Sequence, residues 1–172
     1  IHSAKISLDK TVDLNVVAKG TPGLVGADLE GLVNEAALHA VRKNKKKVSM
    51  FDFEEAKDKM MMGVERKSAI IPQREREIVS YHEAGHALVG YFTEGTDPVH
   101  KVTIIPRGRS LGLTAYLPKE DRSLRSKSFL LGQLDTLMGG RCAEKLIFKD
   151  FTTGASNDIS VATDIAKNMV TQ

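Results

Sequence analysis

The run Tyr81-His-Glu-Ala-Gly-His-Ala87 places two histidines four residues apart, with a glutamate directly after the first. The surrounding residues, 74–92, have the apolar spacing of an amphipathic helix. Residues four apart on a helix lie about 40° apart around its axis and roughly 6 Å apart along it, so both imidazoles can reach one ion. The run therefore predicts a metal site on a helix. Its expected inward face comprises Ile78, Tyr81, Gly85, Leu88 and Phe92.

Glu83 gives this pattern its chemical meaning. Because it follows the first histidine, its carboxylate points to the side, where it can hydrogen-bond a metal-bound water. Zinc polarises a carbonyl and lowers the pKa of bound water to about 7, while the carboxylate takes the proton. We expect Glu83 to act as general base and then to deliver the proton to the leaving amine, with no covalent intermediate. The pattern indicates a zinc-dependent endopeptidase.

A catalytic zinc site needs a third protein ligand and an open position. The metzincin extension would require glycine at position 89 and histidine at position 92, but these are Val89 and Phe92. Three other residues are candidates: His100, Glu144 and Asp158. Local chemistry does not choose among them.

The segment before this helix predicts a small all-helical bundle. Helices are expected at 13–19, from about position 26, and after Ser49, which with Asp52 forms a possible capping box. The expected inward residues of the second helix are Leu29, Leu32, Val33, Ala36, Ala40 and Val41, and those of the third are Phe53, Ala56 and Met60. This bundle ends near Gly63, and the charged stretch 64–73 reads as a linker.

The segment after the metal motif predicts a hairpin followed by helices. Strands are expected at 99–105 and 111–117, each ending at a proline. A helix at 128–147 would turn Leu130, Leu134, Leu137 and Met138 inward, and its Gly139-Gly140 pair indicates close approach by a neighbouring element. Residues 159–170 are again helical in period. The expected fold class is mainly α, with a small β-hairpin.

Composition narrows the class of protein. The chain has 172 residues, 41% hydrophobic and 27% charged, with a net charge of +3, as expected for a globular protein. No apolar run approaches the ~20 residues that cross a bilayer, and the first residues do not read as a signal peptide. The run Lys43-Asn-Lys-Lys-Lys47 reads as a solvated helix end rather than a nucleic-acid site. The single Cys142 excludes an internal disulfide and is expected to be buried.

Three motifs together resemble the FtsH family of ATP-dependent zinc metalloproteases. They are Tyr81-His-Glu-Ala-Gly-His-Ala87, Val102-Thr-Ile-Ile-Pro-Arg-Gly108 and Thr152-Thr-Gly-Ala-Ser-Asn-Asp158. Upstream, Gly20-Thr-Pro-Gly-Leu-Val-Gly-Ala-Asp-Leu-Glu-Gly-Leu-Val-Asn-Glu-Ala-Ala-Leu38 is similar to the helical lid of that family's AAA module. The resemblance implies a lid subdomain at 1–65 and a zinc metallopeptidase domain, C-terminally incomplete, at 66–172.

The resemblance also implies site residues and cofactors. His82, His86 and Asp158 would bind Zn²⁺, Glu83 would be the catalytic carboxylate, and Gly26 and Ala27 would lie near ATP. ATP and Mg²⁺ would act in the intact parent, since no Gly-Lys-Ser/Thr phosphate loop occurs in this chain.

Family members are membrane-anchored homo-hexamers that unfold and processively degrade proteins, including unfolded and membrane proteins. The resemblance therefore implies a membrane anchor in a missing N-terminal part and a location on the cytoplasmic face of the bacterial inner membrane, or on an organelle membrane.

Two other functions stay open at this point. One is a stand-alone zinc peptidase with Glu144 as third ligand, and the other is a non-catalytic assembly fragment. If the chain is a peptidase, an extended substrate could add to the edge of the strand expected at 99–105, through main-chain hydrogen bonds that need little side-chain specificity.

Overall fold

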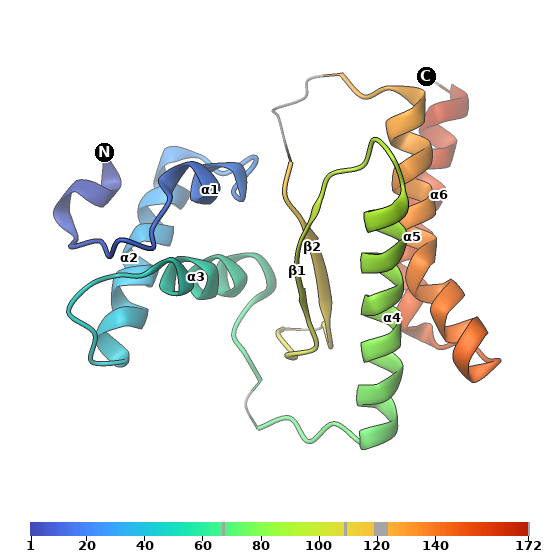
Figure 1. Cartoon of the computed structure of the whole chain (residues 1–172), viewed down its shortest axis with the longest axis horizontal. Coiled ribbons are helices and arrows are strands. Elements are labelled where there is room, and N and C mark those ends of the chain that lie inside the picture. Colours follow the sequence, from blue (N-terminus) through green and yellow to red (C-terminus); the bar gives the residue numbers. More distant parts are fainter. Residues whose placement is uncertain (67, 109, 119–123, 172) are drawn as a thin grey trace. The chain divides into compact units, whose positions relative to one another are not determined.

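The computed structural model describes residues 1–66, 68–108, 110–118 and 124–171, which form two compact units. The first unit comprises residues 1–66 with Arg107 and Gly108, and the second comprises the rest. Over the described residues the chain has six α-helices, two short 3-10 helices and one two-stranded sheet (Figure 1). The prediction of a mainly α fold is confirmed. No described helix is long and apolar enough to cross a membrane.

The first unit is built on two packed helices, α2 (Gly26–Arg42) and α3 (Met50–Met62), preceded by η1 (His2–Lys5) and α1 (Leu14–Lys19). The Asp13 side chain caps α1 by accepting a hydrogen bond from the Asn15 N–H at 2.8 Å. At α3 the N-cap is Ser49, and the carboxylate of Asp52, in the first turn, accepts from the Ser49 N–H at 2.8 Å, as in a capping box. The core of this unit comprises Leu32, Ala36, Ala40, Val48, Phe53 and Ala56.

Two expected core positions of the first unit are wrong. Val41 is 68% exposed and Met60 is 40% exposed. Val41 follows Ala40 and lies about 100° around the helix from it, beyond the narrow stripe that α2 buries against α3. The Met60 methyl group only reaches the rim of that interface, beside Gly31.

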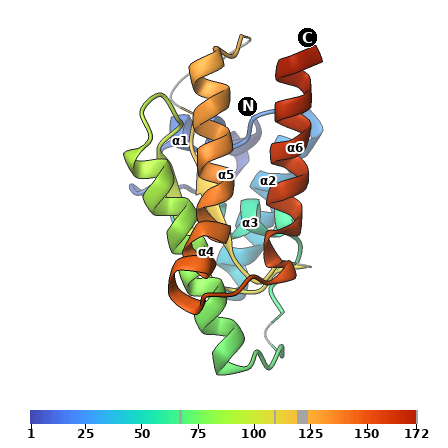
Figure 2. The ribbon, with the colours of Figure 1, turned by 90° about the vertical axis from the view of Figure 1, so that its right-hand side faces the viewer.

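The second unit is a layer of three helices, α4 (Gln73–Phe92), α5 (Lys127–Phe148) and α6 (Ser156–Thr171). The helix α5 packs against both of the others, and η2 (Thr153–Ala155) leads into α6 (Figure 2). The backbones of α4 and α5 touch where Gly85 meets Gly139: a Cβ added to Gly85 would lie 2.4 Å from the Gly139 carbonyl oxygen. The predicted close approach at Gly139 is therefore confirmed.

The buried face of α4 differs from the predicted one. Tyr81, Leu88 and Phe92 are 43%, 60% and 75% exposed, whereas Glu83, Gly85, His86 and Gly90 are buried. Close helix packing through small residues turns the polar side of α4 inward. Apolar periodicity therefore pointed to the wrong face, with Gly85 the one shared member.

The inward face of α5 is likewise built from small and polar residues. Its buried residues are Phe129, Gly132, Thr136, Gly139, Gly140 and Glu144, while the four predicted apolar residues are partly buried. Cys142, expected to be buried, is exposed. It lies about 200° around the helix from Gly140 and so points away from α4.

A β-hairpin packs on α4. Its strands, β1 (Val99–Thr103) and β2 (Leu113–Tyr116), are antiparallel, with Val102 opposite Thr114. Both strands are confirmed but are shorter than predicted. The ladder stops at Thr103, and the chain that follows reaches Pro106, which has no N–H to donate. Tyr116 fits beside α4 because residue 90 is a glycine: a Cβ there would lie 2.8 Å from the tyrosine ring.

Candidate metal centre

His82 and His86 lie on successive turns of α4, and the Nδ1 atom of each ring contacts a hydrogen-bond acceptor on α5. The His82 Nδ1 lies 2.7 Å from Glu144 Oε1, and the His86 Nδ1 lies 2.8 Å from the Thr136 carbonyl oxygen. A carbonyl oxygen only accepts, so His86 must donate from Nδ1, and the same tautomer suits His82 beside a carboxylate. In the neutral rings both Nε2 atoms then carry lone pairs, and these atoms lie only 2.9 Å apart.

Asp158 completes this cluster from the first turn of α6. Its Oδ2 lies 3.3 Å from His82 Nε2 and 3.4 Å from His86 Nε2. Ligand atoms around a tetrahedral zinc, at bond lengths of 2.0–2.1 Å, are about 3.3 Å apart. Two neutral imidazoles and a carboxylate also form a donor set that zinc prefers. These three side chains therefore fit a zinc ion.

The pKa shifts of His82, His86 and Asp158 reflect how closely these three groups face one another. Burial alone would lower the pKa of His82 and His86, but Asp158 together with Glu144 at His82, and Asp158 together with the Thr136 carbonyl at His86, raise both pKa values. Burial alone would raise the pKa of Asp158, but the two histidines lower it to about 2. The two imidazoles and the carboxylate therefore favour a positive charge between them. Either bound protons or a metal ion can supply that charge.

Glu83 lines the same cavity, which measures about 240 Å³. The side chain is buried, and burial raises its pKa above the ordinary value, although the Thr114 hydroxyl and the two histidines oppose this shift. Thr114, on β2, donates to Glu83 Oε2 at 2.7 Å. Raising the pKa of a buried glutamate makes it a better proton acceptor. The remaining lining residues are Ser110, Gly112, Leu113, Gly154 and Asn157.

A glycine on α5 makes room for the histidine pair. A Cβ added to Gly140 would lie 2.6 Å from Nε2 of both His82 and His86. Any side chain at position 140 would therefore fill the space that the two rings and an ion need.

The structure separates the three candidates for third ligand. Asp158 lies with the two histidines, and among the described residues these three form the group with ligand atoms within 4.8 Å of one another. Glu144 holds the opposite nitrogen of His82, and its Oε2 accepts from the Thr152 N–H at 2.7 Å. His100 lies on β1, outside that group.

Other predicted positions lie away from this cluster. Gly26 and Ala27 form the exposed first turn of α2 in the first unit, so their place beside a nucleotide stays a prediction. The strand that lines the metal cavity is β2 rather than β1, because residues 110 and 112–114 form its wall.

Sequence reasoning missed Gly112, Thr114 and Thr136. One signal was available: Gly112, Thr114 and Tyr116 alternate along the predicted strand 111–117 and so share one face of it.

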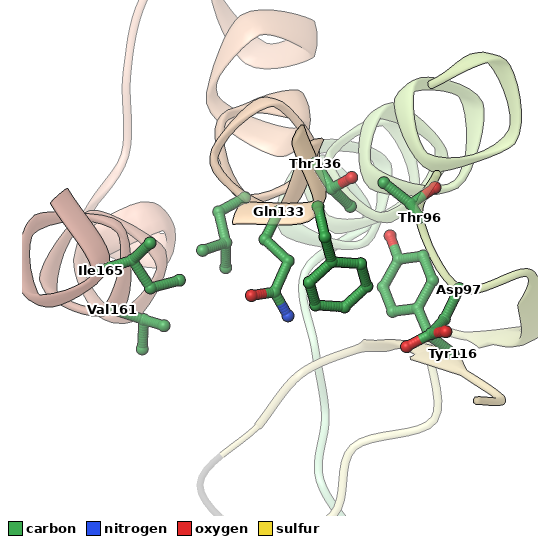
Figure 3. A pocket seen from close by; sticks show the side chains of 9 residues that line it. Thr96, Asp97, Tyr116, Gln133, Thr136, Val161 and Ile165 are labelled. Atoms are coloured by element: carbon green, nitrogen blue, oxygen red, sulfur yellow. The ribbon is translucent and has the colours of Figure 1, made fainter. Parts of the chain in front are cut away.

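A second cavity, of about 180 Å³, borders the supports of His86 (Figure 3). Tyr116 and Thr136 line it, and the Tyr116 hydroxyl donates to the His86 carbonyl oxygen at 3.0 Å. Burial raises the pKa of Tyr116 to about 12, which keeps this donor protonated. Apolar side chains of α5 and α6 form much of the remaining wall: Phe129, Leu137, Val161 and Ile165.

Two known families match successive segments of this chain. Residues 69–172 match the model of peptidase family M41. The chain belongs to peptidase family M41. Residues 11–55 match the AAA+ lid domain, so an M41 segment follows a lid segment in this chain.

Curated relatives extend the match over the whole chain. The chain is 57% identical to "ATP-dependent zinc metalloprotease FtsH 4" of Sorangium cellulosum and 56% identical to "ATP-dependent zinc metalloprotease FtsH" of Endomicrobium trichonymphae, over 100% of its length. It spans about a quarter of those relatives, 27% in both cases. The resemblance of this M41 chain to the FtsH family is confirmed.

Proposed function

We propose that this chain is the lid and catalytic portion of an ATP-dependent zinc metalloprotease. Residues 1–65 are the AAA lid and residues 66–172 belong to the peptidase domain. The observation that carries the proposal is the cluster of His82, His86 and Asp158, with buried Glu83 in the same cavity. The names of the relatives support zinc as the metal and support ATP dependence of the whole protein.

In the proposed reaction the residues of this chain bind the metal ion, orient its ligands and transfer a proton. His82, His86 and Asp158 would hold Zn²⁺, which when bound polarises a peptide carbonyl and acidifies water. Glu83 takes a proton from the attacking water and returns it to the amide nitrogen as the C–N bond breaks. Glu144 and the Thr136 carbonyl keep each Nδ1 occupied, so that Nε2 faces the metal.

An extended substrate would lie beside residues 110–114. Residues 110 and 112–114 line the cavity that holds Glu83 and the metal donors, which favours this side of the hairpin over β1. Main-chain pairing there would allow broad sequence tolerance. The substrates would be unfolded or membrane proteins, as the resemblance to the FtsH family implies.

The same resemblance supports a homo-hexamer with a membrane anchor outside this chain, on the cytoplasmic face of the bacterial inner membrane. It also supports Gly26 and Ala27 as neighbours of the nucleotide. The Glu144 carboxylate lies on the Nδ1 side of His82, which argues against a stand-alone peptidase with Glu144 as the third ligand. An assembly fragment without turnover is distinguished by zinc stoichiometry and a casein digestion assay.

The decisive experiment compares Glu83→Gln with Asp158→Asn in the intact enzyme. Glu83→Gln removes the base but no ligand, so we expect normal zinc content and peptide cleavage reduced at least ~100-fold. Asp158→Asn replaces a charged ligand with a neutral amide, so zinc content and activity should fall together, and excess zinc should restore part of both. Full cleavage by zinc-loaded Glu83→Gln would refute the proposed mechanism.

A further inference from the structure

Among the described residues outside α4, Thr114 donates a hydrogen bond to the Glu83 carboxylate. Its hydroxyl lies 2.7 Å from Glu83 Oε2 and 3.0 Å from the Glu83 carbonyl oxygen. A hydroxyl has one proton to donate, and the shorter of the two contacts is to the carboxylate. Thr114 therefore fixes one oxygen of the group that handles the proton in the proposed reaction.

Gly112 determines the space on the other side of the same carboxylate. A Cβ added there would lie 2.6 Å from Glu83 Oε1, 2.8 Å from Glu83 Cγ and 2.8 Å from Val79 Cγ1. Positions 112 and 114 lie on the same face of the strand segment, since side chains alternate with a period of two. Residue 114 therefore gives Glu83 a hydrogen bond, and the glycine at residue 112 leaves space for its carboxylate.

This contact is placed to restrict the rotamers of Glu83. A glutamate has three side-chain torsions, and a hydrogen bond to its carboxylate restricts them further than burial alone. The Nδ1 atoms of the two histidines are hydrogen-bonded to α5, whereas the Glu83 carboxylate is hydrogen-bonded to the hairpin. The base and the metal ligands are therefore oriented by different elements.

We infer that Thr114 is a positioning residue for the proton-transfer carboxylate, with Gly112 leaving the space in which Glu83 is held. The inference rests on the proposed function. It predicts that the hydroxyl of Thr114 acts on the chemical step and not on metal binding, because the hydrogen bonds described for this hydroxyl go to Glu83 and not to the ligand atoms of the metal donors.

The test compares Thr114→Val with Thr114→Ser in the intact, zinc-loaded enzyme on a short peptide substrate. Valine keeps the shape and removes the hydroxyl, whereas serine keeps the hydroxyl. We expect kcat to fall about 10- to 100-fold in the valine variant, as for outer supports of catalytic groups, with KM and zinc content within about twofold. Serine should restore most of kcat. A matched control is Thr103→Val on β1, whose hydroxyl accepts from the Ile105 N–H and should leave kcat unchanged.

A second arm separates positioning from mere packing. If Thr114 acts through Glu83, Thr114→Val in the Glu83→Gln background should lower kcat by less than threefold further, because the group it orients is already gone. Gly112→Ala should give the same kcat loss with zinc retained. Unchanged kcat in Thr114→Val, or a full additional loss in the double variant, would overturn the inference. Normal cleavage by Glu83→Gln would instead overturn the proposed function.

Discussion

Glu144 and Asp158 both lie within reach of His82, and the two ring nitrogens separate their roles. Glu144 meets Nδ1 at 2.7 Å, while Asp158 faces Nε2 at 3.3 Å and the second histidine at 3.4 Å. Only the second arrangement brings a carboxylate to the point where the imidazole lone pairs converge. Glu144 instead accepts two N–H bonds, from His82 and from Thr152, and so fixes the tautomer of the ring.

This arrangement predicts a graded effect of Glu144→Gln. Glutamine keeps one acceptor oxygen but turns an NH₂ donor toward the other N–H, so one of the two bonds is lost. Zinc affinity should fall about 10- to 100-fold, which is less than the loss in Asp158→Asn. Competition with a chromogenic chelator measures both. Asp135→Asn, an exposed change on the same helix, serves as control. A larger loss in Glu144→Gln than in Asp158→Asn would favour Glu144 as the ligand.

At the scale of elements, the contact between α4 and α5 depends on glycine. The Gly85 and Gly139 backbones meet closely enough that a Cβ on Gly139 would lie 2.6 Å from the Gly85 carbonyl oxygen. This approach brings α5 near enough for Glu144 and the Thr136 carbonyl to reach the histidine rings. Helix separation and ligand orientation are therefore linked.

Gly85→Ala should destabilise the second unit despite the better helix propensity of alanine. The new methyl group would lie 2.4 Å from a backbone oxygen and 2.7 Å from the Ala143 Cβ, and neither can turn away. We expect a loss of roughly 1–3 kcal/mol, as for overpacked cores, measured by urea denaturation. The matched change Gly31→Ala, where the nearest atom lies 3.8 Å away, should be neutral or stabilising by up to about 1 kcal/mol. Equal effects at both glycines would contradict this account.

At the scale of the whole molecule, the metal donors all belong to one compact unit. Residues 82, 86 and 158 lie in the second unit, and the core of the first unit contains none of them. Ligand binding stabilises the part that folds around the ligand. The response of the chain to metal should therefore be confined to the second unit.

Calorimetry of the chain should show two thermal transitions, of which a zinc chelator lowers only one. At zinc concentrations 100-fold above Kd the stabilisation is about 2.7 kcal/mol, enough to shift a domain of this size by several degrees. A variant with His82→Ala and His86→Ala should lack the shift. If both transitions move equally, or neither moves after confirmed metal removal, the assignment of the site to one unit is wrong.

Much of the candidate site was predictable because its chemistry is local. The spacing of His82, Glu83 and His86 on one helix needs only the geometry of that helix, and the segment order of helices and hairpin follows from periodicity and turn residues. The choice of Asp158, by contrast, came from a family resemblance, since 72 positions separate it from His86 and no local rule connects them.

The sequence by itself therefore determined the metal motif, the mainly α class and the positions of the principal elements. Tertiary structure alone decided which face of α4 is buried, which ring nitrogen Glu144 meets and that Thr114 holds Glu83. These outcomes depend on how closely α5 and the hairpin approach α4, and that distance is set by glycines at positions 85, 90, 112 and 139. Apolar periodicity cannot report it, because a glycine contributes no side chain to the pattern and acts only through the backbone that it allows to come near.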